Sequence, residues 1–320
     1  RQWRYRDDRR LRSHGRRLHQ QGHDALAATS VVGEPFPEHA TLSANGSDRR
    51  VVVELRDISR TFGTDPPVQA LRGVDLTMPA GEFLTVIGSN GSGKSTILNA
   101  IAGTFLPDMG TIRIAGADVT RLPEHRRARL IGRVFQDPFK GTCPAMTVAE
   151  NLRMAELRGQ RRGLRLGLGR ASLERYHALL ASLDMRLEGR LQAAMGTLSG
   201  GQRQAVTLLM ATLRRPELLL LDEHTAALDP RAAAQVMRVT DEVVRTQGLT
   251  TLMVTHSMEQ ALEFGDRTIM MHRGVVIADL AGEERKGVTE ADLLVRFAEL
   301  RFTAEMHFTM ELAAVAGELK

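Results

Sequence analysis

One glycine-rich stretch constrains the fold of this 320-residue chain more than any other feature. The sequence GSNGSGKS, residues 88–95, fits the pattern G-x-x-x-x-G-K-[ST] at every fixed position. It follows the apolar run EFLTVI and precedes a stretch with helical character, which is the strand-to-helix context that this pattern requires. The glycines of such a loop let backbone N–H groups close around phosphate oxygens. The stretch therefore predicts an α/β fold with a phosphate-binding loop rather than a chance glycine-rich turn.

The residues of this loop predict ATP and Mg²⁺ as ligands. The ammonium group of Lys94 supplies charge to the β- and γ-phosphates, and the hydroxyl group of Ser95 is a ligand for Mg²⁺. The loop residues expected to bind the nucleotide are Gly88, Ser89, Asn90, Gly91, Ser92, Gly93, Lys94, Ser95 and Thr96.

Apolar strands alternate with helices along the chain from residue 51. The stretches VVVELRDISRTF, EFLTVIG, TIRIAG, RLIGRVFQD, LLLLD and TTLMVTH predict strands, and RTIMMHRGVVIADL predicts a hairpin that turns at Arg273 and Gly274. Helices are expected for GKSTILNAIAG, for residues 148–185 with a break near GLRLGLG, and after Thr289, which is placed as a cap. This alternation predicts a parallel sheet with helices on both faces.

Two acidic residues follow the apolar run at residues 218–221. Carboxylates at the end of a buried strand are costly unless they have partners. Asp222 is placed to hold Mg²⁺ through a water molecule, and Glu223 is placed to polarise the water that attacks the γ-phosphate. The alternative, a strand followed by an ordinary polar turn, is disfavoured because the same chain contains the phosphate-binding loop.

Polar residues also end two other predicted strands. Gln136 follows RLIGRVF, and His256 follows TTLMVT. Ligands of parallel sheets bind at the carboxyl ends of the strands. We therefore expect Gln136 to sense Mg²⁺ and the attacking water, and His256 to contact the γ-phosphate, so that both join Glu223 as candidate catalytic residues. A structural or surface role is the alternative for each residue taken singly.

A second candidate anion site is LSGGQ, residues 198–202. Ser199 is placed to cap a helix that continues through RQAVTLLMATL. Gly200 and Gly201 leave the N–H groups of the first helical turn uncovered. The chain thus contains two helix N-termini suited to phosphate, and one bound nucleotide does not explain both.

Together these motifs resemble the ATP-binding subunits of ABC transporters, over residues 51–300. The motifs that carry the resemblance are GSNGSGKST, the glutamine at 136, LSGGQ, LLLLDE, ALD at 227–229 and the histidine of VTHS. The resemblance implies a P-loop NTPase fold of the ABC type. Such a fold has a predominantly parallel sheet, an antiparallel β subdomain and a helical signature subdomain, here at about 137–215.

The resemblance also accounts for the second anion site. It implies that two subunits face head to tail. The helix that begins at LSGGQ, the signature motif of the family, then closes over ATP held by the other subunit. The residues implied to act across this interface are Ser199, Gly200, Gly201, Gln202 and Asp229. It further implies that Phe62 stacks on adenine, although packing in the core is the alternative for this residue.

Two departures from the family pattern stand near these motifs. His224 takes the place of the proline that usually follows the catalytic glutamate, and RQAVTLLMATL differs from the commoner text after the signature. Replacing proline frees the backbone, so His224 is expected to be a turn residue. Neither change removes a catalytic group, and a homodimer is expected to have two active sites.

Composition limits the other possibilities. The net charge is +5, but arginine so outnumbers lysine that the bias reflects general residue usage, and no nucleic-acid partner is expected. The single cysteine, Cys143, excludes an intrachain disulfide. No apolar run approaches the roughly 18–20 residues that cross a bilayer. Residues 1–50 predict a disordered, Arg-rich arm, and residues 301–320 predict a C-terminal helical extension.

The resemblance implies an ATP-hydrolysing subunit that energises a separate membrane permease, as in bacterial importers of small solutes such as amino acids. It implies a cytoplasmic location at the inner face of the cell membrane, with a solute-binding protein in the full system. The docking surface is expected near Gln136 and within 148–185, with Glu150→Lys as a probe of coupling.

Two other classes fit fewer of the motifs. A soluble ABC ATPase acting on nucleic acid or ribosomes is expected to add coiled coils, zinc-binding cysteines or a second cassette, which this sequence lacks. A small-molecule kinase with a phosphate-binding loop has no need of LSGGQ or Asp229.

Overall fold

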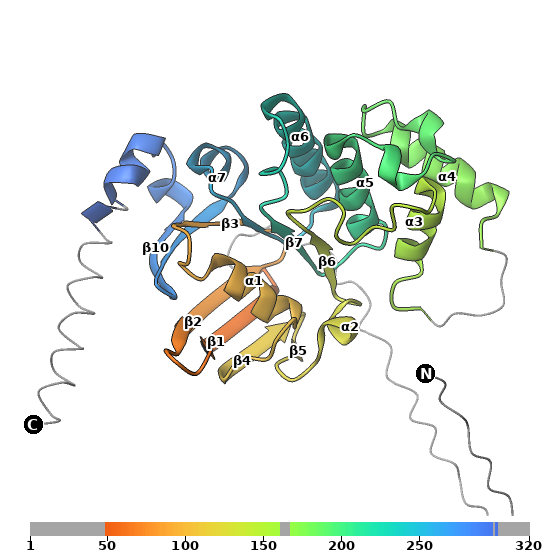
Figure 1. Ribbon diagram of the computed structural model, residues 1–320. Coiled ribbons are helices and arrows are strands. Elements are labelled where there is room, and N and C mark those ends of the chain that lie inside the picture. Colours follow the sequence, from red (N-terminus) through yellow and green to blue (C-terminus); the bar gives the residue numbers. More distant parts are fainter. Residues whose placement is uncertain (1–48, 161–166, 297, 300–320) are drawn as a thin grey trace, which may run out of the picture. The chain divides into compact units, whose positions relative to one another are not determined.

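The computed structural model describes residues 49–160, 167–296 and 298–299, which form an α/β fold with two sheets (Figure 1). The arm predicted for residues 1–50 lies almost entirely outside the described residues. The extension predicted for residues 301–320 lies wholly outside them.

The larger sheet has the strand order β10-β9-β3-β8-β7-β6. Strands β9, β3, β8, β7 and β6 are parallel, and β10 pairs with β9 in the antiparallel sense. The prediction of a predominantly parallel sheet is therefore confirmed. Its strands are β3 (Phe83–Gly88), β6 (Ile131–Val134), β7 (Leu218–Asp222), β8 (Thr251–Val254), β9 (Arg267–His272) and β10 (Val275–Ala281).

The smaller sheet is antiparallel, with the order β2-β1-β4-β5. Its strands are β1 (Val51–Phe62), β2 (Val68–Pro79), β4 (Met109–Ile114) and β5 (Ala117–Asp118). This sheet confirms the antiparallel β subdomain, although the sequence patterns did not predict β2. Figure 1 shows it beneath the parallel sheet, with α1 between the two.

Seven α-helices connect the described strands. They are α1 (Lys94–Ala102), α2 (Glu124–Arg127), α3 (Val148–Glu156), α4 (Arg170–Ala181), α5 (Gly200–Thr212), α6 (Pro230–Gln247) and α7 (Met258–Phe264). Helices α3, α4 and α5 lie within the range 137–215, for which we predicted a helical subdomain, and Figure 1 shows them together at one end of the parallel sheet.

The run of leucines in β7 explains how the layers are held together. Leu218 and Leu220 belong to the core shared by α1 and the antiparallel sheet, whereas Leu219 and Leu221 belong to the core under α5 and α6. All four side chains are buried. A strand that is covered on both faces needs apolar residues at every position, because successive side chains point to opposite faces.

Candidate active site

The phosphate-binding loop connects β3 to α1, as its sequence predicts. Its glycines are required by close approaches of backbone from elsewhere in the chain. A Cβ atom at Gly88 would lie 2.3 Å from the carbonyl oxygen of Met271, and one at Gly93 would lie 2.8 Å from that of Ala70. Both glycines also have positive φ, at 150° and 105°. No other residue type fits these positions without moving the backbone behind the loop.

Lys94 folds back over the loop that it follows. Its Nζ donates hydrogen bonds to the carbonyl oxygens of Gly88 at 2.9 Å and Ser89 at 3.1 Å. Burial lowers the pKa of this ammonium group, and the charge of Glu223 acts in the opposite direction. Among the described residues, the buried hydroxyl group of Ser92 has no hydrogen-bond partner. A buried cation, an orphaned hydroxyl and a glycine-lined backbone fit the phosphate groups of a nucleotide.

Glu223 stands at the centre of the candidate site. It follows the last residue of β7, and its own N–H donates to the carbonyl oxygen of Val254 in β8 at 2.9 Å. Its Oε1 lies 2.6 Å from His256 Nε2, and its Oε2 accepts a hydrogen bond from Gln136 Nε2 at 3.2 Å. The structure therefore brings together the three predicted catalytic side chains at the carboxyl ends of β6, β7 and β8.

Three residues were predicted to bind Mg²⁺. Gln136 follows β6 and contacts Glu223, whereas the other two lie on elements that pack together. Ser95 is in the first turn of α1, and Asp222 ends β7, which contacts α1. Within the described part of the chain, no group of three or more His, Cys, Asp or Glu side chains is placed to hold a metal ion. This donor set fits Mg²⁺ bound with a nucleotide, because Mg²⁺ in such sites takes one or two protein ligands, phosphate oxygens and water.

Helix α5 begins at the LSGGQ motif. Ser199 is its N-cap, and Ser199 and Gln202 form a capping box. A Cβ atom at Gly200 would lie 3.0 Å from Leu228, and one at Gly201 would lie 3.1 Å from Ala232, so these glycines also let α5 approach the start of α6. The motif thus has a local packing role, which sequence reasoning did not identify.

Asp229 and Phe62 also have local contacts. Asp229 caps α6, because its Oδ1 accepts a hydrogen bond from the N–H of Ala232 at 3.0 Å. The ring of Phe62 is 38% exposed and meets Phe105 edge to face, with the ring centroids 5.1 Å apart. The guanidinium group of Arg60 lies over both rings. The partly exposed ring leaves stacking on adenine as a prediction, and the contact with Phe105 leaves packing as its alternative.

His224 lies in a turn, as predicted, but its side chain is buried beneath α6. Its Nε2 lies 3.1 Å from Thr240 Oγ1, and burial lowers its pKa to about 4, which keeps the ring neutral near pH 7. The hydroxyl proton of Thr240 is donated to the carbonyl oxygen of Val236 at 2.8 Å. When Thr240 donates to Val236, the hydrogen bond to His224 forms with the proton on Nε2, which donates it to Thr240. The polar Thr240 on the buried face of α6 was the only signal in the sequence.

Glu150 proves unsuitable as a probe of coupling. Its Oε2 accepts hydrogen bonds from the N–H of Thr147 at 2.7 Å and from its hydroxyl group at 2.8 Å, which completes a capping box at the start of α3. These bonds lower the pKa of the Glu150 carboxyl group. A lysine here would remove half of the cap, so a loss of coupling in Glu150→Lys would not identify a docking surface.

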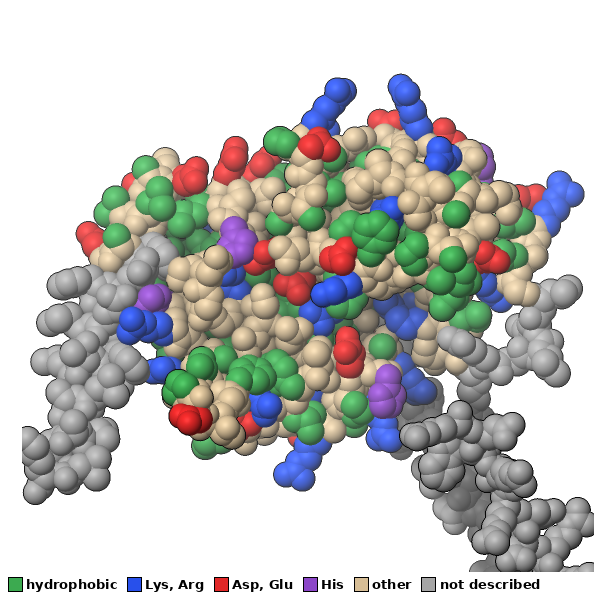
Figure 2. All heavy atoms as spheres, in the orientation of Figure 1, with side chains coloured by type: hydrophobic (Ala, Val, Ile, Leu, Met, Phe, Trp, Pro, Cys, Tyr) green, Lys and Arg blue, Asp and Glu red, His purple; other side chains and the backbone are tan. Residues whose placement is uncertain are grey.

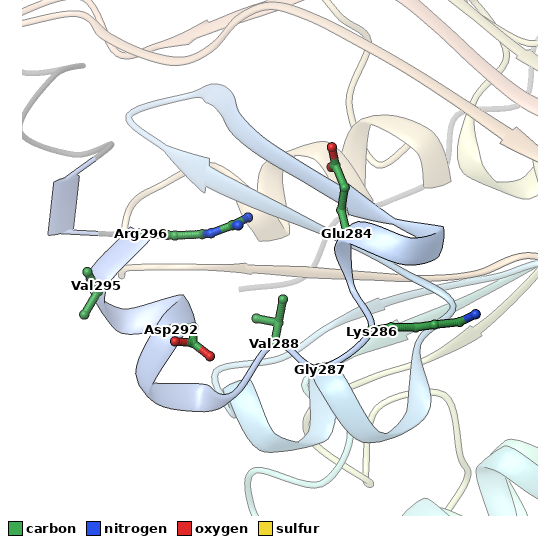
Figure 3. Close-up of a pocket in the computed structure, with 7 residues that line it drawn as sticks. All are labelled: Glu284, Lys286, Gly287, Val288, Asp292, Val295 and Arg296. Atoms are coloured by element: carbon green, nitrogen blue, oxygen red, sulfur yellow. The ribbon is translucent and has the colours of Figure 1, made fainter.

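One pocket lies apart from all of these residues. It has a volume of about 450 Å³ and is shown in Figure 3. Side chains of both charges project from its walls. Its lining residues are Glu284, Lys286, Gly287, Val288, Asp292, Val295 and Arg296. None of them belongs to the predicted site.

Comparisons with known proteins identify the family. A family model described as ABC transporter matches residues 71–226. The tyrosine transport ATP-binding protein of Clostridioides difficile is 40% identical over 248 residues, which cover 77% of this chain and 98% of that protein. The methionine import ATP-binding protein MetN of Rhizobium etli is 36% identical over 256 residues, which cover 78% of this chain and 64% of MetN.

Solved structures agree with this assignment. A dimeric ATP-binding cassette in a post-hydrolysis state, bound to ADP and Pi, is 29% identical and superimposes with a TM-score of 0.63 over 72% of this chain and 98% of its own. Within the described residues, no helix is both long enough and apolar enough to cross a membrane. The phosphate-binding loop, the residues gathered at the strand ends and these matches show that the chain belongs to the ABC transporter family, as an ATP-binding and ATP-hydrolysing subunit.

Proposed function

We propose that this chain hydrolyses ATP to drive a separate membrane permease that imports a small solute such as an amino acid. The observation that carries the proposal is the contact of Glu223 with both Gln136 and His256 at the ends of three parallel strands. Relatives named for tyrosine transport and methionine import support a small solute as cargo. A phosphate-binding loop together with the carboxylate of Glu223, which Gln136 and His256 hold in place, supports ATP hydrolysis as the energy source.

Each residue of the site has a step to perform. Lys94 and the loop N–H groups bind the β- and γ-phosphates, and Ser95 and Asp222 would hold Mg²⁺, which supplies positive charge to the reacting phosphates. Glu223 orients the attacking water and accepts its proton. In this proposal His256 and Gln136, which both contact Glu223, fix its carboxylate. His256 would also contact the γ-phosphate, and Gln136 would contact Mg²⁺ and the attacking water.

A second copy of the chain completes each site in this proposal. The N-terminus of α5, with Ser199, Gly200 and Gly201, would close over ATP bound to the phosphate loop of the other copy. Asp229 would lie where the two copies meet. The support is that α5 begins with two glycines and a capped turn, which suits a helix N-terminus to anions, and that a related cassette forms a dimer.

The permease would dock on the helical part of the chain, so that the protein works at the inner face of the membrane, together with a solute-binding protein. Phe139 and Met154 are large apolar residues in this part, and they are 52% and 48% exposed. Figure 2 shows hydrophobic side chains at the surface in the right half of the view. Exposed apolar groups next to the Gln136 segment favour a protein partner here.

The substitution Glu223→Gln tests the proposed chemistry. We expect it to retain ATP binding and to lower turnover by about 10²-fold or more, because the amide cannot accept the proton of water. It should also accumulate an ATP-bound dimer, measured by size-exclusion chromatography. Glu217→Gln is the control, because Glu217 lies just before β7 and pairs with Arg50 away from the site. Turnover at the wild-type rate in Glu223→Gln would refute the assignment.

A further inference from the structure

Arg133 is a charged residue within the parallel sheet to which the mechanism above assigns no role. It lies in β6 between apolar neighbours, and its side chain is only 12% exposed. Its Nη2 donates hydrogen bonds to Asp222 Oδ2 at 3.1 Å and to Asn99 Oδ1 at 2.7 Å, and its Nη1 donates to Thr104 Oγ1 at 3.2 Å. A single guanidinium group thus links α1, the loop that follows α1, and the end of β7.

Strand register explains why these groups meet. Arg133 pairs with Leu220 of β7, so Asp222, two residues further along, points to the same face of the sheet. This is the face covered by α1, because Leu220 packs in the core that contains the apolar residues of α1. Asn99 lies one helical turn after Ser95 in α1. Arg133 is therefore bonded directly to Asp222, a predicted Mg²⁺ ligand. Through Asn99 it is also bonded to α1, the helix that carries Ser95, another predicted ligand.

The carboxylate of Asp222 needs a counter-charge at all times. Its side chain is 16% exposed, and a largely buried carboxylate without a cation is costly. Arginine keeps its charge under all ordinary conditions. The bond from Arg133 engages Oδ2, so the Asp222 side chain is held in one orientation beside a positive charge.

We propose that Arg133 is a positioning residue that neutralises Asp222 and thereby weakens the hold of the site on Mg²⁺. The proposal rests on the proposed function, in which Asp222 would bind Mg²⁺ with ATP. Removing Arg133 has two opposing effects, because it frees the carboxylate to move and also strengthens the attraction of that carboxylate for a divalent cation. We expect the second effect to be the larger, because the guanidinium lies 3.1 Å from the carboxylate and would repel a divalent cation bound to the same carboxylate. The advantage of a weaker hold is easier release of the metal with the product.

The test measures how much Mg²⁺ strengthens nucleotide binding. The dissociation constant of a fluorescent ATP analogue is determined for the full chain with Mg²⁺ and with EDTA. The constant in EDTA divided by the constant in Mg²⁺ gives a ratio that is compared between variants. We expect this ratio to be several-fold higher in Arg133→Met than in the wild type, and to stay near the wild-type value in Arg133→Lys, which keeps the charge. Arg133→Gln is a second neutral variant, which retains a hydrogen-bond donor.

Arg267→Met is the matched control. Arg267 also lies in a strand of the parallel sheet, is 18% exposed and pairs with two carboxylates, those of Glu82 and Asp279. It should lose stability as Arg133→Met does, yet keep the wild-type response to Mg²⁺. The proposal is overturned if the ratio is unchanged or falls in both neutral variants, or if Arg133→Lys changes it as much as they do. A wild-type chain without any strengthening by Mg²⁺ would instead overturn the proposed metal site, and this inference with it.

Discussion

Glu223 adopts a backbone conformation that its residue type disfavours. Its φ is +44°, in the left-handed region, which costs a residue with a Cβ atom roughly 1–2 kcal/mol. The bond from its N–H to Val254 and the two side-chain contacts with His256 and Gln136 hold it there. Left-handed residues that the surroundings maintain in this way are concentrated at functional sites. The conformation turns the carboxylate away from the direction that a continuing strand would give it.

His224, the next residue, gives a prediction about stability. Thr240→Val should leave the buried Nε2–H of His224 without an acceptor and lower the free energy of unfolding by about 1–3 kcal/mol. Thr212→Val is the control, since Thr212 is also buried in a helix and bonds the carbonyl oxygen of Leu208, four residues before it. Urea denaturation compares the two. Equal losses in both variants would show that the bond to His224 contributes nothing.

The sequence indicated candidate residues for the site, but it did not indicate all the contacts that hold them in place. The phosphate loop, Asp222 and Glu223 belong to short motifs whose chemistry is local. Arg133 and His224 take partners 89 and 16 residues away, and these partners are decided by strand register and helix packing. Polar residues inside an apolar strand or helix face are the only sign of such contacts in a sequence, and that sign does not name the partner.

Strand β2 shows that long-range pairing can also hide a whole element from sequence-based prediction. Its buried residues include Leu71, Val74, Leu76 and Met78, so the alternation is broken between Leu71 and Val74. The pairing of β1 with β2 shifts register in this region, because bulges interrupt the ladder. A bulge adds a residue to one strand and destroys the period of two on which strand prediction depends. Strands β3 and β7, which have no bulge, were predicted nearly to their ends. Strand β1 was also predicted, although its ladders shift register, because it begins with three consecutive valines.

Helix α5 gives a prediction about dimerisation. Ser199→Arg should block ATP-driven dimerisation and turnover, because a long charged side chain would occupy the space of the partner's nucleotide. Since Ser199 also caps α5, the control is Thr147→Ala, which removes the cap of α3. This control should lose about 1 kcal/mol of stability and still dimerise. Light scattering in the presence of ATP measures whether each variant is a monomer or a dimer. Normal dimerisation of Ser199→Arg would show that the signature does not act across an interface.

At the scale of the whole molecule, the helical part should transmit the state of the nucleotide to the permease. Met154→Glu is expected to reduce co-purification with the membrane subunits and to spare basal ATPase activity, because Met154 is exposed on α3, a helix that contains none of the predicted site residues. Leu294→Glu is the control, with 52% exposure near the C-terminal end of the described residues. Equal losses in the two variants would contradict a docking surface on α3.

The contacts behind the phosphate loop have a consequence for synthesis of the chain. Strand β3 pairs with β8 and β9, and the N–H of Gly274, in the β9–β10 turn, donates to the carbonyl oxygen of Ser92 at 2.9 Å. The loop leaves the ribosome early, but its neighbours in β9 and in the β9–β10 turn are made only when translation reaches residue 274. A nascent chain cannot gain stability from ATP before then, because the ligand stabilises only the folded site. Nucleotide binding therefore stabilises only those chains in which the parallel sheet is complete.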